Sequence, residues 1–528
     1  MGLGLRFHKG WSLIFLCVVL SACTKGFQVG LMPWPNSLQS SSIGNNVVPV
    51  MINVNDNVQS IINSNPPGTT YEFNAGIYRL IAISPQAGDT YLGETGVVFN
   101  GSKILTNFTQ SGNIWVIGGQ TQRGRVHGQC QAGFPMCAYP DDVFFDNQPL
   151  LHVGSVGAVV SGTFFFDYVN SLIYIGNNPA GHLVEAATTR VAFSPTADNV
   201  TIKGFTIEKY SNEAQAGAIG DYNAGQGWDV ENNEVRLTHG VGIKVGGNNS
   251  VMIGNFVHNN GQLGVAVSEL GGSSNNGIVE RNEISANNYA GHDPGWEAGA
   301  SKFWSTTNLK VRCNYVHDNL GPGLWTDTDN LNTLYDQNIV ISNAGMGIVH
   351  EVSYAAIISN NIVKWNSQNW FGWLYGAQIL SSVSENVEIT GNSIEVAAGG
   401  GVGIGVIQQA RGTAPDGSTY LAINNWVHGN TITFLADIST NSSVSGSPAV
   451  LISGAAVDIT GTQFWAPGNI RFDYNTYHAP SLSVAHWAWN GATLDWSDYK
   501  ATGQDTHGYA DTNVELDTTA YSVPATCP

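Results

Sequence analysis

The chain of 528 residues carries 20 basic and 39 acidic side chains, which gives a formal net charge of −19. This balance argues against nucleic acid and anionic membrane surfaces as partners, and it disfavours polyanionic substrates unless a local basic patch overrides the average. Hydrophobic residues make up 42% of the chain and charged residues only 11%, so we expect a globular protein with an extensive core.

The first 23 residues have the features of an export signal. A basic start is followed by the apolar stretch Trp11 to Leu20, which is too short to span a bilayer. The stretch ends in Leu20-Ser-Ala-Cys23, which resembles a bacterial lipobox and implies lipidation of Cys23, with ordinary cleavage as the alternative. We therefore expect residues 1–23 to be a lipoprotein signal peptide. The protein would be exported, then anchored at the cell envelope through this lipid alone or secreted.

Residues 24–45 have a polar composition typical of a flexible tether. A short amphipathic helix is predicted within 46–104, because Val58, Ile61 and Ile62 recur at helical spacing. Residues 105–198 contain short runs of aromatic and β-branched residues, such as 162–166 and 172–175. These runs predict antiparallel strands joined by hairpins.

Four of the six cysteines follow the export signal. Cys130 and Cys137 lie seven residues apart in a loop rich in Gly and Pro, and an oxidising compartment favours a local disulfide between them. A metal pair is a weaker alternative because no His is suitably spaced. Cys313 and Cys527 either pair with each other or stay free.

From residue 199 onward the chain repeats one phrase, in which an Asn precedes a β-branched apolar residue by two positions. The steps between successive Asn residues are 22, 27, 32, 24, 23, 31 and 38. A period near 22 to 24 built from short strands, with loops added to some units, is typical of a solenoid. The Asn residues of the repeat are Asn233, Asn255, Asn282, Asn314, Asn338, Asn361, Asn392 and Asn430.

The predicted fold is all-β, a right-handed parallel β-helix (solenoid) with a small inserted antiparallel β-domain. Residues 46–104 would form the N-terminal cap and first coils, 199–475 the main β-helix, and 476–528 a C-terminal capping segment. The Asn residues would stack inward as a ladder. The repeat resembles the right-handed parallel β-helix superfamily of pectate lyases and β-helical glycosidases. The segment 162–175 resembles the β-domain inserted in several β-xylosidase-like bacterial enzymes of that superfamily.

Two carboxylates fall at the same place in successive coils. Asp327 follows Asn314 by 13 residues, and Glu351 follows Asn338 by 13 residues. Residues at equivalent positions on neighbouring strands lie about 4.8 Å apart, and alternation along the strand turns both side chains outward. A carboxylate pair at this spacing suits a retaining glycosidase. We predict Asp327 as the nucleophile and Glu351 as the acid/base.

Other side chains are expected beside this pair. Lys302 would face outward next to Trp325 and hold Asp327 ionised, and Lys244 occupies the same position two coils earlier. An inserted loop at 287–298 would project beside the cluster. The predicted substrate-binding residues are Trp325, Trp296, Glu297, His292, Asp329 and Lys244, with Trp325 and Trp296 as the sugar platform.

The sequence leaves several interpretations open. The carboxylate pair could instead bind Ca²⁺ or align by chance; apart from possible Ca²⁺, no cofactor is expected. The first functional hypothesis is an exported glycoside hydrolase, a monomer that acts on a glycan. The second is a polysaccharide lyase with Lys302 or Lys244 as its base. The third is a non-catalytic glycan-binding or surface structural protein.

Overall fold

A computed structural model describes residues 48–222, 225–268, 272–368, 373–440, 450–460 and 469–527. The predicted signal peptide, Cys23 and the whole of the predicted tether lie outside these residues. All of the described residues belong to one compact unit, Ile43–Pro528. None of the helices in this part of the chain is long and apolar enough to cross a membrane.

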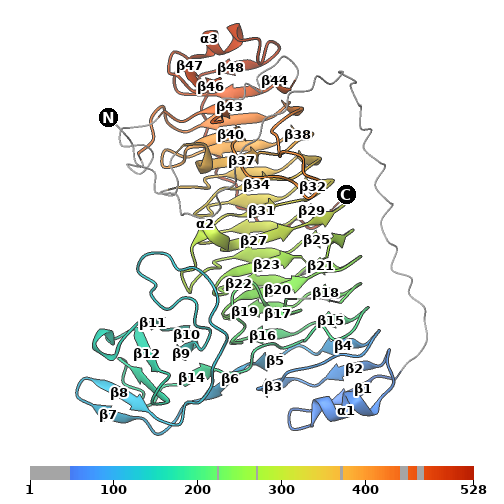
Figure 1. Cartoon of the computed structure of the whole chain (residues 1–528), viewed down its shortest axis with the longest axis vertical. Helices are drawn as coiled ribbons and strands as arrows, with labels where there is room; N and C mark the ends of the chain where they lie inside the picture. The colour runs from blue at the N-terminus through green and yellow to red at the C-terminus, as the bar shows by residue number, and fades with distance from the viewer. Residues whose placement is uncertain are drawn as a thin grey trace. The chain divides into compact units, whose positions relative to one another are not determined.

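Three long sheets run the length of this unit, stacked coil upon coil (Figure 1). Sheet A comprises β1 (Val50–Ile52), β2 (Thr70–Phe73), β4 (Thr90–Gly93), β15 (Thr201–Lys203), β18 (Asp229–Glu231), β21 (Val251–Ile253), β25 (Ile278–Glu280), β29 (Lys310–Arg312), β32 (Thr333–Asp336), β35 (Ala356–Ser359), β38 (Val387–Thr390), β41 (Asn425–His428) and β44 (Ile470–Asp473).

Sheet B comprises β3 (Gly76–Arg79), β5 (Val97–Asn100), β16 (Thr206–Glu208), β19 (Glu234–Arg236), β22 (Phe256–His258), β26 (Glu283–Ser285), β30 (Tyr315–His317), β33 (Ile339–Ile341), β36 (Ile362–Lys364), β39 (Ser393–Val396), β42 (Thr431–Phe434), β45 (Thr476–His478) and β48 (Tyr509–Asp511). Sheet C comprises β17 (Gly217–Ile219), β20 (Val241–Val245), β23 (Leu263–Val267), β27 (Gly299–Trp304), β31 (Leu324–Asp327), β34 (Ile348–Glu351), β37 (Ala377–Ser382), β40 (Val402–Gln408), β43 (Ser453–Asp458), β46 (Trp487–Trp489) and β47 (Ala492–Leu494).

The predicted fold is confirmed as a right-handed parallel β-helix. From β17 onward the successive coils contribute strands to all three sheets in turn, whereas the first coils contribute to sheets A and B only. Strands of successive coils pair in parallel with aligned register, as for β18 with β21 and β21 with β25. The core is a continuous column of buried side chains, since alternate residues of every strand point inward.

The predicted Asn ladder is present at the turn between sheets A and B. Each Asn donates its backbone N–H and its side-chain Nδ2 to the Oδ1 of the next coil's Asn, at 2.8–3.1 Å, from Asn233 through Asn430 to Asn475. A second ladder runs five residues later in each coil, from Asn260 to Asn366, and ends on Gln378. Both ladders satisfy buried polar groups that the turns would otherwise leave unpaired.

The two ends of the β-helix are covered. Helix α1 (Val58–Ser64) begins at Asn57, whose side chain accepts a hydrogen bond from the Ser60 N–H, and its buried Val58 and Ile62 join the core. At the other end, helix α3 (Trp496–Ala501) and the hairpin β46–β47 pack aromatic side chains onto the last coils. Val58 and Ile62 at one end and Trp487 and Tyr499 at the other belong to the same buried core as the coils.

The inserted β-domain lies beside the first coils (Figure 1). It has a four-stranded sheet of β6 (Ser102–Ile104), β9 (Val143–Phe145), β10 (Gln148–Pro149) and β14 (Val184–Ala187), and a five-stranded sheet of β7 (Thr109–Ser111), β8 (Ile114–Ile117), β11 (Leu151–His152), β12 (Thr163–Asp167) and β13 (Leu172–Ile175). Strands β12 and β13 form the antiparallel hairpin that the sequence predicts.

Two disulfides tie down segments outside the coils. Cys130 and Cys137 are bonded in the loop of the inserted domain, as predicted. Cys313, at the end of β29, is bonded to Cys527. The second bond holds the C-terminal end of the chain beside β29 and β32 (Figure 1).

The last rung of the first ladder makes a testable contribution to stability. Asp505 accepts hydrogen bonds from Asn475 and the Tyr477 hydroxyl, and burial raises the pKa of this carboxyl to about 6. Because the pKa in the folded state lies above the unfolded value, stability is greatest below the unfolded pKa and falls as pH rises through about 6. Asp505→Asn should therefore stabilise the protein above pH 6, by about 2 kcal/mol.

Urea unfolding at pH 4 and at pH 7.5 measures this difference. The variant and the wild type should have similar midpoints at pH 4, and the variant should be the more stable at pH 7.5. Asp498→Asn, on the exposed face of α3, is the matched control and should change neither midpoint appreciably. An equal effect of Asp505→Asn at both pH values would contradict the account.

Candidate active site

The two predicted carboxylates are neighbours on sheet C. Asp327 ends β31 and Glu351 ends β34, and the register pairs Trp325 with Val349, Thr326 with His350, and Asp327 with Glu351. Thr326 and His350 point into the core, where the His350 Nδ1 lies 2.8 Å from the Thr326 hydroxyl. Asp327 and Glu351 therefore face out from the core, about one strand spacing of 4.8 Å apart.

Two cations hold this pair in place. The Lys302 Nζ donates to the Asp327 Oδ2 at 2.8 Å. The Arg411 guanidinium is ion-paired with Glu351, and its second nitrogen lies 3.9 Å from the Asp327 Oδ1. The four charges balance, which offsets the repulsion that two adjacent carboxylates would otherwise feel.

Glu351 is more enclosed than the outward register alone predicts. Only 4% of its surface is exposed, because Arg411 and Trp325 cover it. Burial raises the pKa of Glu351, and the charge of Asp327 raises it further, whereas Arg411 and Lys302 act in the opposite direction. Asp327 is half-buried and open to the pocket beside it.

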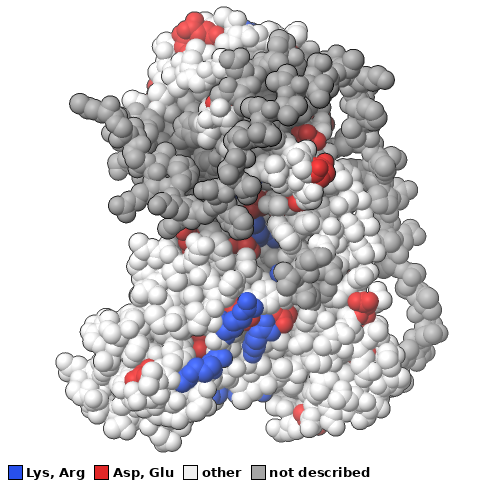
Figure 2. All heavy atoms as spheres, viewed as in Figure 1, with Lys and Arg blue, Asp and Glu red and all other residues white. Residues whose placement is uncertain are grey.

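That pocket has a volume of about 450 Å³ and lies on sheet C between the coils and the inserted domain. Figure 2 shows basic side chains gathered in the hollowed part of this face, next to that domain. The lining residues come from the insert, the segments that flank β17, four further strands of sheet C with the residue that follows β23, and helix α2 (Pro294–Glu297). They are Arg125, His127, Gln215, Tyr222, Lys244, Ala266, Ser268, Trp296, Glu297, Lys302, Trp304 and Asp327.

The aromatic platform differs from the prediction. Trp325 is buried, its Nε1–H donates to the Glu351 Oε2 at 3.2 Å, and the Lys302 Nζ lies 3.2 Å from its ring centroid. Its face is therefore not free to stack on a sugar. Trp304, which pairs with Asp327 in the register, is 37% exposed and lines the pocket instead, together with the predicted Trp296.

Besides Trp325, two predicted binding residues do not line the pocket. His292 is fully buried and packs edge to face against His239. The disulfide-bonded loop of the inserted domain covers it, because Cys130 of that loop forms an antiparallel β-bridge with His292. The Asp329 Oδ1 accepts a hydrogen bond of 2.6 Å from the Tyr420 hydroxyl. The expectation that the loop 287–298 presents His292 to a substrate is therefore wrong.

Lys244 and Glu297 do line the pocket, and both contact Gln215. The Lys244 Nζ donates to the Gln215 carbonyl oxygen at 3.1 Å, and the Gln215 side-chain amide donates to the Glu297 Oε2 at 2.7 Å. The His127 Nε2 lies 2.9 Å from the side-chain oxygen of the same residue. Gln215 thus connects the inserted domain, sheet C and helix α2.

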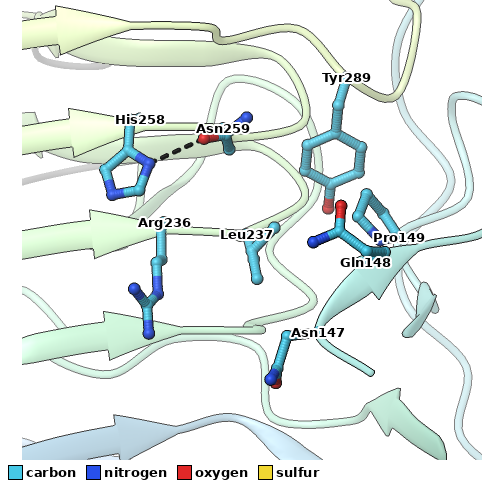
Figure 3. Close-up of a pocket in the computed structure, with 8 residues that line it drawn as sticks. All are labelled: Asn147, Gln148, Pro149, Arg236, Leu237, His258, Asn259 and Tyr289. Carbon is cyan, nitrogen blue, oxygen red and sulfur yellow. Dashed lines mark hydrogen bonds between the residues drawn. The ribbon is translucent and has the colours of Figure 1, made fainter. Parts of the chain in front are cut away.

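A second pocket, of about 430 Å³, lies between the inserted domain and the ends of β19 and β22 (Figure 3). Its Arg236 is bonded to Glu208 and Glu234, and its His258 to Glu234 and Asn259. None of its lining residues is Asp or Glu. This pocket therefore lacks the carboxylate pair that marks the site on sheet C.

No group of three or more His, Cys, Asp or Glu side chains in the described ranges is placed to hold a metal ion. At the carboxylate pair itself, Lys302 and Arg411 supply the positive charge that the calcium alternative assigns to the ion.

Several residues of the site are missing from the sequence prediction. Trp304 follows Lys302 by two positions, so extending the alternation along that strand would have found it. Arg411 lies in a long connection after β40 that departs from the repeat. Arg125 and His127 belong to the inserted domain, where no period relates them to the coils. No sequence signal identifies these three.

The comparisons with known proteins agree with this architecture. The family model described as "Right handed beta helix region" matches residues 217–394. No curated protein is similar enough in sequence to match the chain. The solved structure of XylC in complex with xylose aligns with a TM-score of 0.60 and 14% identity, over 87% of this chain and 83% of that chain.

Two further structures align less closely. The A-module of the mannuronan C-5 epimerase AlgE4 from Azotobacter vinelandii gives a TM-score of 0.42 at 12% identity, over 88% of this chain and 95% of that chain. A structure described as a glycoside hydrolase aligns with a TM-score of 0.40 and 9% identity, over 83% of this chain and 92% of that chain. At 14% identity the likeness to XylC shows the fold alone. The stacked coils, the Asn ladders and the matching family model identify the chain as a right-handed parallel β-helix protein.

Proposed function

We propose that the chain is a carbohydrate-active enzyme, a glycoside hydrolase that cleaves a polysaccharide or oligosaccharide with Asp327 and Glu351. The observation that carries the proposal is the pairing of these residues on adjacent strands beside an open pocket lined by Trp296 and Trp304. XylC, which has the same fold, is described in complex with the sugar xylose, and this supports a glycan ligand.

The geometry suits a double displacement with retention. Retaining enzymes hold their carboxyl groups about 5–5.5 Å apart, close to the spacing of adjacent strands. The Asp327 carboxylate would attack the anomeric carbon while Glu351 gives its proton to the glycosidic oxygen, which leaves as an alcohol. The Glu351 carboxylate would then take a proton from water, whose oxygen displaces Asp327 from the sugar.

The raised pKa of Glu351 supports its role as the acid. A carboxyl group that keeps its proton at a higher pH is available to protonate a leaving group, whereas an ionised partner is available to attack. Arg411 covers Glu351, so a bound substrate must displace this guanidinium before the glycosidic oxygen reaches the acid.

One observation favours a polysaccharide lyase as the second candidate. Lys244 lines the pocket, and burial lowers the pKa of its ammonium group, which is the direction a general base needs. A lyase would remove a proton next to a carboxyl group of the substrate and leave an unsaturated sugar, whereas a hydrolase leaves a new reducing end and no double bond.

A panel of glycans tests the two reactions together. The purified protein should release reducing ends from at least one glycan without ultraviolet absorbance from an unsaturated product. Asp327→Asn, assayed in parallel, should release none. Unsaturated products would favour the lyase, and binding without turnover of any glycan would favour the non-catalytic alternative.

We also propose that the protein is exported and anchored through Cys23. Expressed in a bacterial host with lipoprotein processing, the mature chain should begin at a Cys23 that carries two or three acyl groups by intact mass. Cys23→Ser should remove the mass increment and release the protein from the membrane fraction. A mature N-terminus beyond Cys23 with no lipid would exclude the anchor.

A further inference from the structure

The pocket end opposite Asp327 contains a lysine whose charge has no close counter-ion. Lys244 is on β20 and only 7% exposed. Its Nζ donates to a backbone carbonyl, that of Gln215, and lies 5.5 Å from the Tyr222 ring centroid. Among the described residues, no carboxylate oxygen lies within 4.0 Å of this ammonium, the limit for an ion pair.

A buried ammonium without a counter-ion is unfavourable because the protein interior solvates charge poorly. Burial lowers the pKa of Lys244, and the more distant Glu297 and Asp221 oppose that effect without cancelling it. The Glu297 carboxylate is held by the Gln215 amide. An anionic group of a ligand placed against Lys244 would supply the missing counter-charge.

A second cation at this end of the pocket is also available. Arg125 is exposed, stacks 5.2 Å from the Tyr222 ring centroid, and lies 3.7 Å from Glu213. Glu213 already has a closer partner in Arg190, at 2.7 Å. Arg125 can therefore turn to a ligand without leaving Glu213 unpaired, and its planar guanidinium matches the geometry of a carboxylate or sulfate.

The position of this end relative to the carboxylate pair indicates which part of a substrate it meets. Lys244 and Asp327 are on β20 and β31, with β23 and β27 between them. Three strand steps separate the two backbones by about 14 Å. The two cations therefore face a part of the glycan displaced from the bond that Asp327 and Glu351 would cleave.

We propose that this end of the pocket binds a sugar unit bearing an anionic group, a carboxylate or a sulfate, through Lys244 and Arg125. The inference rests on the proposed function for the identity of the ligand as a glycan. The net charge of −19 disfavours anionic substrates, but the local positive charge of Lys244 and Arg125 outweighs it at this site.

Binding measured without turnover tests the proposal. Calorimetry on full-length Asp327→Asn should detect D-galacturonate or D-galactose 6-sulfate at least about ten-fold more tightly than D-galactose, and higher salt should weaken the difference. The methyl ester of galacturonate should bind like galactose. The carboxylate and sulfate arms show which group the site prefers. Equal affinity for the neutral and both charged sugars would overturn the proposal.

Variants then assign the effect to its residues. Arg125→Gln changes an exposed side chain and should fold normally, and Lys244→Met should abolish the preference for the charged sugar. Lys203→Met, on the exposed surface of sheet A, is the matched control and should preserve it. An unchanged preference in both Arg125→Gln and Lys244→Met would overturn the assignment. Because no arm needs cleavage, a failure here is distinguishable from a failure of the proposed hydrolysis.

Discussion

Asp327→Asn should reduce turnover of the true substrate by roughly 10³-fold or more, the scale on which loss of a catalytic nucleophile acts. The substitution preserves the shape of the side chain and removes the charge that would attack the anomeric carbon. The fold should persist, because Asp327 faces the pocket and contributes nothing to the core. Initial rates on the active glycan, with the unfolding midpoint measured alongside, give the result.

Asp318→Asn provides the comparison, since Asp318 is an exposed carboxylate near the end of β30 on sheet B. It should retain the activity of the wild type. Near-full activity in Asp327→Asn would remove this residue from the mechanism and direct attention to Glu297, the other carboxylate in the pocket.

Glu351→Gln should lower turnover by a similar factor on substrates with poor leaving groups and by much less on aryl glycosides, whose leaving group needs no proton. The pH profile should change as well. Because the pKa of Glu351 is raised, the wild type should keep its activity to a pH above the ordinary Glu range and lose it as Glu351 ionises. That alkaline limb should disappear in the variant.

Glu388→Gln removes a more exposed glutamate on sheet A. This variant should keep both the wild-type rate and the loss of activity at alkaline pH. If Glu351→Gln slows aryl and natural substrates equally and the alkaline limb persists, Glu351 is not the acid.

The repeat made the fold and the carboxylate pair predictable. In a solenoid the side-chain alternation and the coil period together fix the register, so Asp327 and Glu351 could be aligned by counting from Asn314 and Asn338. The same count aligned Lys302 with Trp325, which the structure brings into contact.

The segments that cover the strands could not be predicted by counting along the repeat. Arg411 reaches Glu351 from a connection with no period, and its contact turns an outward carboxylate into a buried one. His292 was expected on a projecting loop, but the inserted domain packs over it. Contacts between a solenoid and its insertions depend on tertiary packing that no repeat encodes.

The stereochemistry of the first product tests the central claim most directly. Proton NMR of the reaction with the active glycan, recorded before the anomers equilibrate, identifies the configuration at the newly released anomeric carbon. Attack by Asp327, followed by water activated by Glu351, predicts that the product keeps the configuration of the substrate. An inverted product, or an unsaturated one, would contradict the account.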